Sequence, residues 1–149
     1  MNEKGSYISN DKYANNLGIE LVKVETEFAR CELEINENHK NGLGTLHGAV
    51  IFALADIAFA AACNTVNTSI GMQADIKFLN KPEGSRLIAE ANIVSGSNKI
   101  GHYHVRISDN EGVHVAEFNS ISYRFPLNRR CINDDSFVNC IKNQNVLTK

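Results

Sequence analysis

The stretch between Asn41 and Asn64 constrains the fold more than any other part of the chain. It reads NGLGTLHGAVIFALADIAFAAACN, and its second half contains a single charged residue, Asp56. Apolar residues on every face predict a helix that is buried all round, and we place this helix at Gly48–Asn64. The run is shorter than the ~20 residues that a membrane-spanning helix needs. We therefore expect one central helix in a globular domain and no membrane partner.

A carboxylate in the middle of such a helix needs an explanation. Burying an unpaired charge costs a desolvation free energy on the order of several kcal/mol, whereas alanine or leucine at the same position would carry no such cost. Asp56 is therefore a candidate functional acid. A structural acid, paired with a lysine, an arginine or a backbone amide, would explain the residue equally well from physics alone.

The start of the predicted helix is a second candidate site. Gly42 and Gly44 make the preceding loop flexible, and His47-Gly48 lies where the apolar run begins. A helix start leaves its first N–H groups unpaired and carries a partial positive charge. Eight residues separate Gly48 from Asp56, a rise of about 12 Å. The two could act on one atom only across an interface, which predicts a homodimer or a dimer of dimers (homotetramer).

Alternation of apolar and polar residues predicts six strands around this helix. They lie at 19–24, 28–35, 72–78, 87–93, 103–107 and 113–125. We expect Glu117 to mark a bulge in the last strand, and a short helix at Asp11–Leu17, capped by Asp11, ahead of the first. Short turns at 81–84 and 109–112 favour antiparallel pairing of consecutive strands. The pattern thus predicts an α+β domain, with the helix against one face of an antiparallel sheet.

The central motif resembles a known family. The pattern is Asn-Gly-x-Gly-x-x-His-Gly-Ala from Asn41, followed by Leu-Ala-Asp-x-Ala-Phe around Asp56; segments 75–82 and 95–107 are also similar. It resembles the hotdog-fold acyl-CoA thioesterases, most of all the phenylacetate-degradation (4-hydroxybenzoyl-CoA thioesterase-like) subgroup, over about residues 10–126. The resemblance implies a hotdog fold, an antiparallel β-sheet wrapped around one long central α-helix.

The resemblance also implies an activity and catalytic residues. The enzyme would hydrolyse the thioester bond of an aryl- or fatty-acyl-CoA to free acid and CoA. Asp56 would act as nucleophile or as general base, a choice that the sequence leaves open. The Gly48 N–H would polarise the thioester carbonyl. Asn41 would orient water or the carbonyl, and for His47 we favour a hydrogen bond to a loop carbonyl over proton transfer.

Coenzyme A carries phosphates, so the resemblance also implies substrate-binding residues on nearby strands and loops. The candidates are Phe78, Lys81, Ser97, Asn98 and Lys99. The lysines would be explained nearly as well as solvated surface residues. His102, His104 and Arg106 form a polar stripe without a cysteine or carboxylate at ligand spacing, so we expect no metal. We expect no other cofactor.

Two other functions remain open for a domain of this kind. One is a non-catalytic acyl-CoA-binding module, for which Asp56 would have no use. The other is a hotdog dehydratase or hydratase, which usually needs an aspartate and a histidine close together in sequence. The chain also has Ala49 where many family members have a second glycine. Its methyl group would narrow the approach to the helix start but would leave the Gly48 N–H in place.

Composition sets the remaining expectations. A net charge of −2 gives no reason to expect a nucleic-acid partner, and 43% hydrophobic residues suffice for a core. The N-terminus shows no secretory signal, and the four cysteines match no zinc or redox motif. We therefore predict a cytoplasmic protein with free thiols. Residues 1–10 are expected to be flexible, 11–126 to form the hotdog thioesterase domain and 127–149 to be a polar tail.

Overall fold

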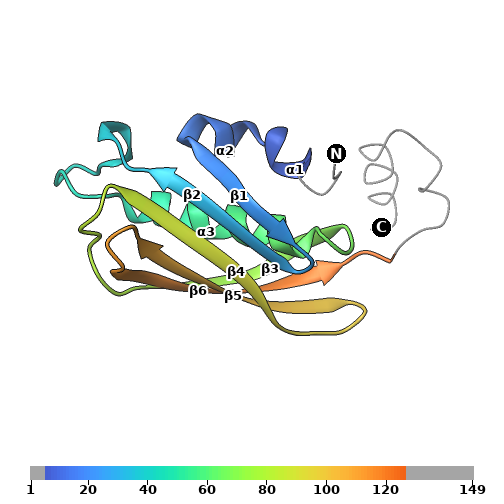
Figure 1. The fold of residues 1–149 in the computed structure, drawn as a ribbon. Coiled ribbons are helices and arrows are strands. Elements are labelled where there is room, and N and C mark those ends of the chain that lie inside the picture. The colour runs from blue at the N-terminus through green and yellow to red at the C-terminus, as the bar shows by residue number, and fades with distance from the viewer. Residues whose placement is uncertain (1–5, 127–149) are drawn as a thin grey trace, which may run out of the picture.

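The computed structural model describes residues 6–126 of the 149. A six-stranded antiparallel sheet, in the order β1-β2-β4-β5-β6-β3, wraps around the long helix α3 (Figure 1). The helices are α1 (Ser6–Ser9), α2 (Lys12–Leu17) and α3 (Gly48–Cys63), with a 3-10 turn, η2, at Glu37–His39. The strands are β1 (Ile19–Glu25), β2 (Phe28–Glu34), β3 (Ser69–Phe78), β4 (Arg86–Gly96), β5 (Ile100–Asp109) and β6 (His114–Arg124). The predicted α+β architecture with one central helix is confirmed.

Helix α3 is held at its C-terminal end by one side chain. The Asn64 amide donates to the Ala60 carbonyl at 2.9 Å, and its Oδ1 accepts from the Ser69 N–H at 2.9 Å. Asn64 therefore closes the last turn and joins the helix to the first residue of β3. Asp11 caps α2 as predicted, accepting from two backbone N–H groups at its start.

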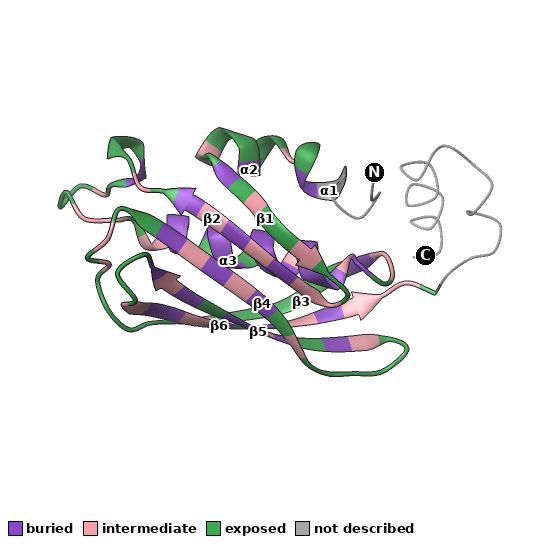
Figure 2. Ribbon diagram, in the orientation of Figure 1, coloured by how far each residue is buried: buried purple, intermediate pink, exposed green. Residues whose placement is uncertain are grey.

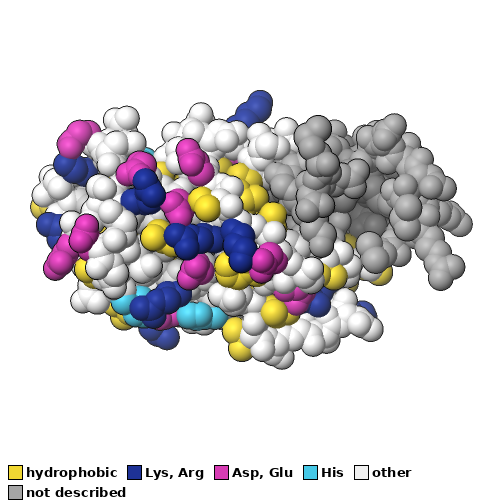
Figure 3. Space-filling model, in the orientation of Figure 1, with side chains coloured by type: hydrophobic (Ala, Val, Ile, Leu, Met, Phe, Trp, Pro, Cys, Tyr) yellow, Lys and Arg dark blue, Asp and Glu magenta, His cyan; other side chains and the backbone are white. Residues whose placement is uncertain are grey.

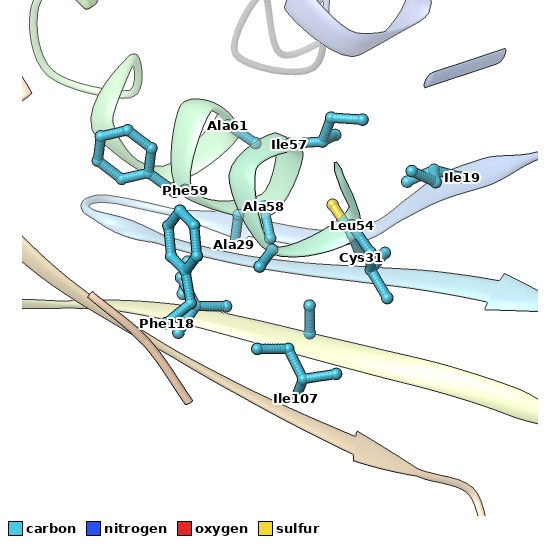
Figure 4. Packing of buried hydrophobic residues seen from close by; sticks show 14 of the residues in the cluster. Ile19, Ala29, Cys31, Leu54, Ile57, Ala58, Phe59, Ala61, Ile107 and Phe118 are labelled. Carbon is cyan, nitrogen blue, oxygen red and sulfur yellow. The ribbon is translucent and has the colours of Figure 1, made fainter. Parts of the chain in front are cut away.

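Small residues let the sheet and α3 approach each other closely. Ala58 on the helix and Ala29, Ala89 and Ala91 on the sheet have no exposed surface. Larger side chains such as Phe59, Ile107 and Phe118 fill the space beside this alanine layer (Figure 4). Dense packing of this kind makes most of the helix a fixed base for whatever its uncovered face carries.

Alternation in β2, β4 and β5 follows the prediction, whereas β3 departs from it. Buried residues alternate with partly exposed or exposed ones along β2, β5 and the first half of β4 (Figure 2). Strand β3 is exposed along nearly its whole length. The reason is topological: residues 79–85 do not form a hairpin but carry the chain from β3, at one edge of the sheet, to β4 in its interior. An edge strand lacks a neighbour on one side, so its apolar residues Ile70, Met72 and Phe78 remain exposed.

The bulge predicted at Glu117 lies instead at Val115. Ile107 on β5 pairs with Ala116, but the next residue, Ser108, pairs with His114. Val115 is therefore the extra residue, and it and Ala116 are both fully buried. Two successive buried residues break the period-two pattern, which explains the impure alternation in this strand.

A buried carboxylate, Asp109, holds the β3–β4 connection in place. Its two oxygens accept from four backbone N–H groups, those of Glu83, Gly84, Glu111 and Val113, at 2.7–3.0 Å. Desolvation alone would raise the pKa of Asp109, but these four donors outweigh it and hold the pKa below its usual value. Asp109 thus joins the 79–85 connection to the β5–β6 turn at the end of the sheet where β3 ends.

The two ends of the chain are covered only in part by the structure. Residues 1–10 were expected to be loose, but Ser6–Ser9 form a helical turn in which Ile8 is buried; residues 1–5 lie outside the described part. The predicted tail, 127–149, with its two cysteines, also lies outside it. Cys31 and Cys63 are buried free thiols, as predicted. Among the described residues, no helix has the length and apolar character needed to cross a bilayer.

Candidate active site

The first turn of α3 leaves one backbone donor free. His47 precedes the helix, and its Nδ1 accepts from the Ala49 N–H at 3.0 Å. The Val50 N–H donates to the His47 carbonyl at 3.0 Å. The Gly48 N–H has no acceptor among the residues that the structure describes. The helix start therefore presents an unpaired donor at the positive end of a helix of 16 residues.

His47 has a different partner from the one predicted. We expected its side chain to bond a loop carbonyl; instead it accepts a backbone N–H, because a ring nitrogen at this position reaches the second amide of the helix. Accepting at Nδ1 requires a lone pair there, so the proton of the neutral ring lies on Nε2. The backbone N–H of His47 donates to the His39 carbonyl at 2.8 Å, which fixes the loop ahead of the helix.

Asn41 organises the loop between η2 and α3. Its Oδ1 accepts from the N–H groups of Leu43 and Thr45 and from the Thr45 hydroxyl, at 2.9–3.2 Å. The Asn41 amide nitrogen bonds to no other group in the described residues, so it is available to a ligand. The oxygen thus stabilises the turn, and the amide nitrogen is the group left for the predicted role of orienting water or the carbonyl.

Phe78 lies against Gly48. A β-carbon built on Gly48 would lie 3.2 Å from Cζ of the Phe78 ring, so the ring touches the helix start from the last residue of β3. This is the one substrate-binding candidate that the structure places next to a catalytic candidate within a single chain. Lys81 follows three residues later, on the connection that Asp109 holds.

Asp56 is exposed in the single chain, contrary to the prediction of a buried acid. The reason is that the sheet covers most of α3 but leaves one stripe free. Ala49, Phe52 and Asp56 are exposed on that stripe, and Ala60 is partly exposed. Local desolvation still raises the pKa of Asp56, and the negative charge of Asp11 adds to the shift. A carboxylate with a raised pKa in an apolar stripe is suited to accept a proton.

The remaining substrate-binding candidates lie at the other end of the sheet. Phe78 pairs with Ala116 near the start of β6, whereas the Lys99 carbonyl accepts from the N–H of Arg124 at its end. Arg124 lies eight positions after Ala116 along the strand, a distance of about 26 Å. A single chain therefore does not bring Ser97, Asn98 and Lys99 to the Gly48 end.

Lys81 and Lys99 nevertheless share a property that fits phosphate binding. Among the lysines in the described residues, only these two and Lys12 make no ion pair with a carboxylate. An exposed lysine with no acidic neighbour keeps its full charge for an anionic ligand. Both lie in turns next to strand ends rather than within a charged ladder.

The predicted histidine stripe lies on the outer face of the sheet, among alternating acidic and basic side chains (Figure 3). His104 and His114 lie against the two oxygens of the Glu117 carboxylate. Within residues 6–126, no group of histidine, cysteine and acidic side chains is arranged to hold a metal ion. These side chains partner one another on the side of the sheet away from α3.

Two buried groups escaped the sequence analysis. One is Asp109, and the other is a cluster of Glu27, Tyr103 and Arg124 beneath the β4–β5 turn. Arg124 could have been noticed, because it falls in the same alternation phase as Ser120 and Ser122, which are buried. Its partner Glu27 is 97 residues away in sequence, so no local pattern connects the two.

Comparison with known families identifies the superfamily to which this domain is similar. A model of the thioesterase superfamily matches residues 43–116, which include the helix start, Asp56 and the strands β3, β4 and β5. Asn41 lies just ahead of the matched segment. The match therefore covers most of the candidate residues.

Individual relatives agree with the family model. The acyl-coenzyme A thioesterase PaaI of Escherichia coli is 32% identical over 117 residues, 77% of this chain and 84% of the relative. The solved structure of the E. coli PaaI protein, from the phenylacetic acid degradation operon, superposes with a TM-score of 0.78 at 28% identity, covering 83% and 94% of the two chains. A variant of PaaI from Thermus thermophilus gives 0.74 at 28% identity, covering 77% and 100%. These neighbours confirm the predicted hotdog fold.

Proposed function

Because the chain belongs to the thioesterase superfamily, we propose that it hydrolyses the thioester bond of an acyl-coenzyme A, releasing a free acid and coenzyme A. The acyl group is of the aryl or fatty class. The enzyme is a thioester hydrolase that needs no metal or other cofactor. The buried free thiols Cys31 and Cys63 fit a cytoplasmic location.

One observation carries the proposal for the site: the Gly48 N–H is the first-turn donor that has no acceptor within residues 6–126. A thioester carbonyl placed there would accept this N–H, and the helix dipole would favour the negative charge that develops on its oxygen during attack. His47 supports this arrangement by taking the neighbouring Ala49 N–H, which orients the turn without competing for the ligand.

Asp56 drives the attack by one of two routes. As general base, its carboxylate takes a proton from a water molecule whose oxygen attacks the thioester carbon. As nucleophile, the carboxylate attacks directly and forms a mixed anhydride, which water then hydrolyses. In both routes the carbon–sulfur bond breaks and sulfur leaves as the thiolate. Since an ordinary thiol has a pKa near 8.5, the leaving group needs little help from an acid.

The active site is proposed to be shared between two chains. Gly48, Phe78 and Lys81 lie at one end of the sheet, whereas Ser97–Lys99 lie at the other. Pairing two copies of the exposed strand β3 about a two-fold axis would bring opposite ends together. The same axis would cover the apolar stripe of each α3, and the Asp56 of one chain would face the Gly48 of the other. A further pairing of two such dimers would give a tetramer.

The activity is tested by incubating the protein with aryl-, short-chain and long-chain acyl-coenzyme A and measuring the free thiol that hydrolysis releases. We expect Asp56→Asn to lower kcat at least about 100-fold on the best substrate, because it removes the base or nucleophile. Circular dichroism should show an unchanged fold, since an amide has the same shape. Retention of more than about a tenth of the wild-type kcat would place the reacting group elsewhere.

A further inference from the structure

An ion pair is buried beneath the β4–β5 turn, at the end of the sheet away from Gly48. Arg124 Nη2 donates to Glu27 Oε1 at 2.5 Å, and the Tyr103 hydroxyl donates to the same oxygen at 3.2 Å. The side chains of Arg124 and Glu27 are only 11% and 15% exposed. The three residues come from β6, the β1–β2 turn and β5, so the pair joins three separate segments.

This cluster is expected to contribute little to the stability of the fold. A buried ion pair gains little or nothing over well-packed apolar side chains of similar size. Glu27 has a φ of +59°, in the left-handed region that glycine or asparagine occupies at lower cost. The buried Arg124 Nε has no acceptor among the described residues. A role beyond stability would explain why the chain keeps these features.

Arg124 bonds both ends of the β4–β5 turn, one through its side chain and the other through its backbone. Arg124 Nη1 donates to the Ser97 carbonyl at 3.0 Å, and the backbone N–H of Arg124 donates to the Lys99 carbonyl at 2.8 Å. Asn98, between these two anchors, is exposed, and its N–H bonds to no acceptor in the described residues. The turn is therefore held from beneath while its polar groups face solvent.

Two glycines make room for the guanidinium. A β-carbon on Gly101 would lie 3.0 Å from Arg124 Nη2, and one on Gly96 would lie equally close to the same atom. Gly96 and Gly101 pair with each other across the hairpin. The backbone at the base of the turn thus lies close to the arginine, and a side chain at either position would require the guanidinium to shift by a few tenths of an ångström.

We propose that Arg124 is a positioning residue that presents the turn of Ser97, Asn98 and Lys99 to the phosphates of the nucleotide part of coenzyme A. This inference rests on the proposed function, since it takes acyl-coenzyme A as the ligand. The Lys99 ammonium and the Asn98 N–H, which have no partner in the part of the chain that the structure describes, supply charge and a donor for phosphate. Holding the backbone of the turn in place lowers the entropy lost on binding.

The experiment compares coenzyme A with pantetheine, which lacks the nucleotide and its phosphates. Calorimetry on the full chain should show that Arg124→Met weakens coenzyme A binding about tenfold while pantetheine binding changes less than about twofold. Arg30→Met is the matched control: Arg30 also donates to a glutamate on the sheet, Glu32, but touches no part of the turn. Equal weakening for both ligands would mean a general structural role and would overturn the proposal.

A double-mutant cycle with Lys99→Ala sharpens the result. If Arg124 acts through the turn, its substitution should weaken coenzyme A binding much less once Lys99 has been removed; independent effects would contradict the proposal. Should Arg124→Met fail to fold, Arg124→Lys keeps a positive charge beside Glu27 but has one nitrogen in place of the two that reach Ser97 and Glu27, and it should show the same selective loss.

Binding measurements also separate this inference from the proposed activity. One possible result is that Arg124→Met selectively weakens coenzyme A binding although the wild-type protein hydrolyses no acyl-coenzyme A. This result would support the role of Arg124 and refute the thioesterase reaction. A wild-type protein that does not bind coenzyme A would overturn the inference.

Discussion

Strands β1 and β3 are the two edges of one sheet, but they present very different surfaces. Strand β1 has seven residues, of which Glu20, Lys23 and Glu25 are charged, and the segment α1–α2 lies beside it (Figure 1). Lys23 pairs with Glu25 at 2.8 Å and lies over the ring of Phe28. Charges and neighbouring segments of this kind protect an edge strand from pairing with another chain.

Strand β3 has ten residues, of which only Asp75 and Lys77 are charged. It exposes Ile70, Met72 and Phe78, and it runs beside the uncovered stripe of α3 that carries Phe52 and Asp56. A long apolar edge next to an apolar helix face is the form expected of an interface between chains. The contrast indicates that β1 is built to stay single and β3 to be paired, so the catalytic side of the molecule is the side that a second chain would complete.

The largest expected effect comes from placing the same charge on each edge. Both edges have a bulge with an exposed apolar residue, Val22 on β1 (53% exposed) and Met72 on β3 (60% exposed). Met72→Lys should dissociate the dimer and lower kcat/KM at least about 100-fold, because an unpaired charge would be buried at the interface. Val22→Lys should leave both unchanged. Analytical ultracentrifugation and thioester hydrolysis measure the two outcomes, and equal effects would remove the distinction between the edges.

Mixing two inactive variants tests whether pairing through β3 creates the shared site. Gly48→Pro removes the free N–H but keeps the helix, since proline is tolerated at the first helical position and His47 already has the extended backbone that precedes proline. Random exchange with Asp56→Asn chains should restore about a quarter of wild-type activity, because half of the dimers are mixed and each has one intact site. Exchange without recovery, with mixed dimers shown by mass spectrometry, would place the whole site in one chain.

A smaller effect, on KM, is expected to distinguish a lysine near β3 from a lysine near β1. Lys81, on the connection after β3, and Lys12, on α2 beside β1, both lack an ion pair among the described residues. Lys81→Ala should raise KM for acyl-coenzyme A about three- to tenfold through loss of a phosphate contact, with kcat little changed. Lys12→Ala should change neither constant. Steady-state kinetics decide the matter, and a rise in KM for Lys12→Ala alone would reverse the assignment of the two sides.

The smallest expected effect is electrostatic: the charge of Asp11, on the β1 side of the molecule, acts on Asp56 in the candidate active site. Asp11 caps α2, and its charge adds to the desolvation that raises the pKa of Asp56. Asp11→Asn retains the capping oxygen but loses the charge, so the pKa of Asp56 should fall. Because Asp56 must be ionised to act, the acidic limb of the kcat/KM profile should move to lower pH. A limb that stays in place or moves upward would show that Asp11 has no such influence.

Much of the fold was predictable because its elements have local causes. The central helix was placed at Gly48–Asn64 and is found at Gly48–Cys63 with Asn64 as its cap. The Asp11 cap, the turn at 109–112 and the six strands follow from side chains close in sequence. The candidate catalytic residues could be proposed for the same reason, since the helix start and Asp56 lie on one continuous element.

What the sequence could not supply depends on contacts between distant segments. Alternation in β3 is the same whether a strand lies inside a sheet or at its edge, so its exposure could not be predicted. The apolar surface of α3 predicted burial on every side, yet no segment within residues 6–126 covers the stripe with Asp56. Glu27 and Arg124 illustrate the same limit, because each is unremarkable until the fold brings them together.

The contact between Phe78 and Gly48 has a thermodynamic consequence. In the proposed dimer, strand β3 joins the two chains, and its last residue, Phe78, lies against Gly48, whose N–H is proposed to bind the thioester oxygen. A substrate that touches both chains binds only the associated form, so by mass action its binding free energy adds to that of association. Activity per chain should therefore fall on dilution, and acyl-coenzyme A should shift that loss to lower protein concentrations. The cellular abundance of the protein would then set how active each molecule is.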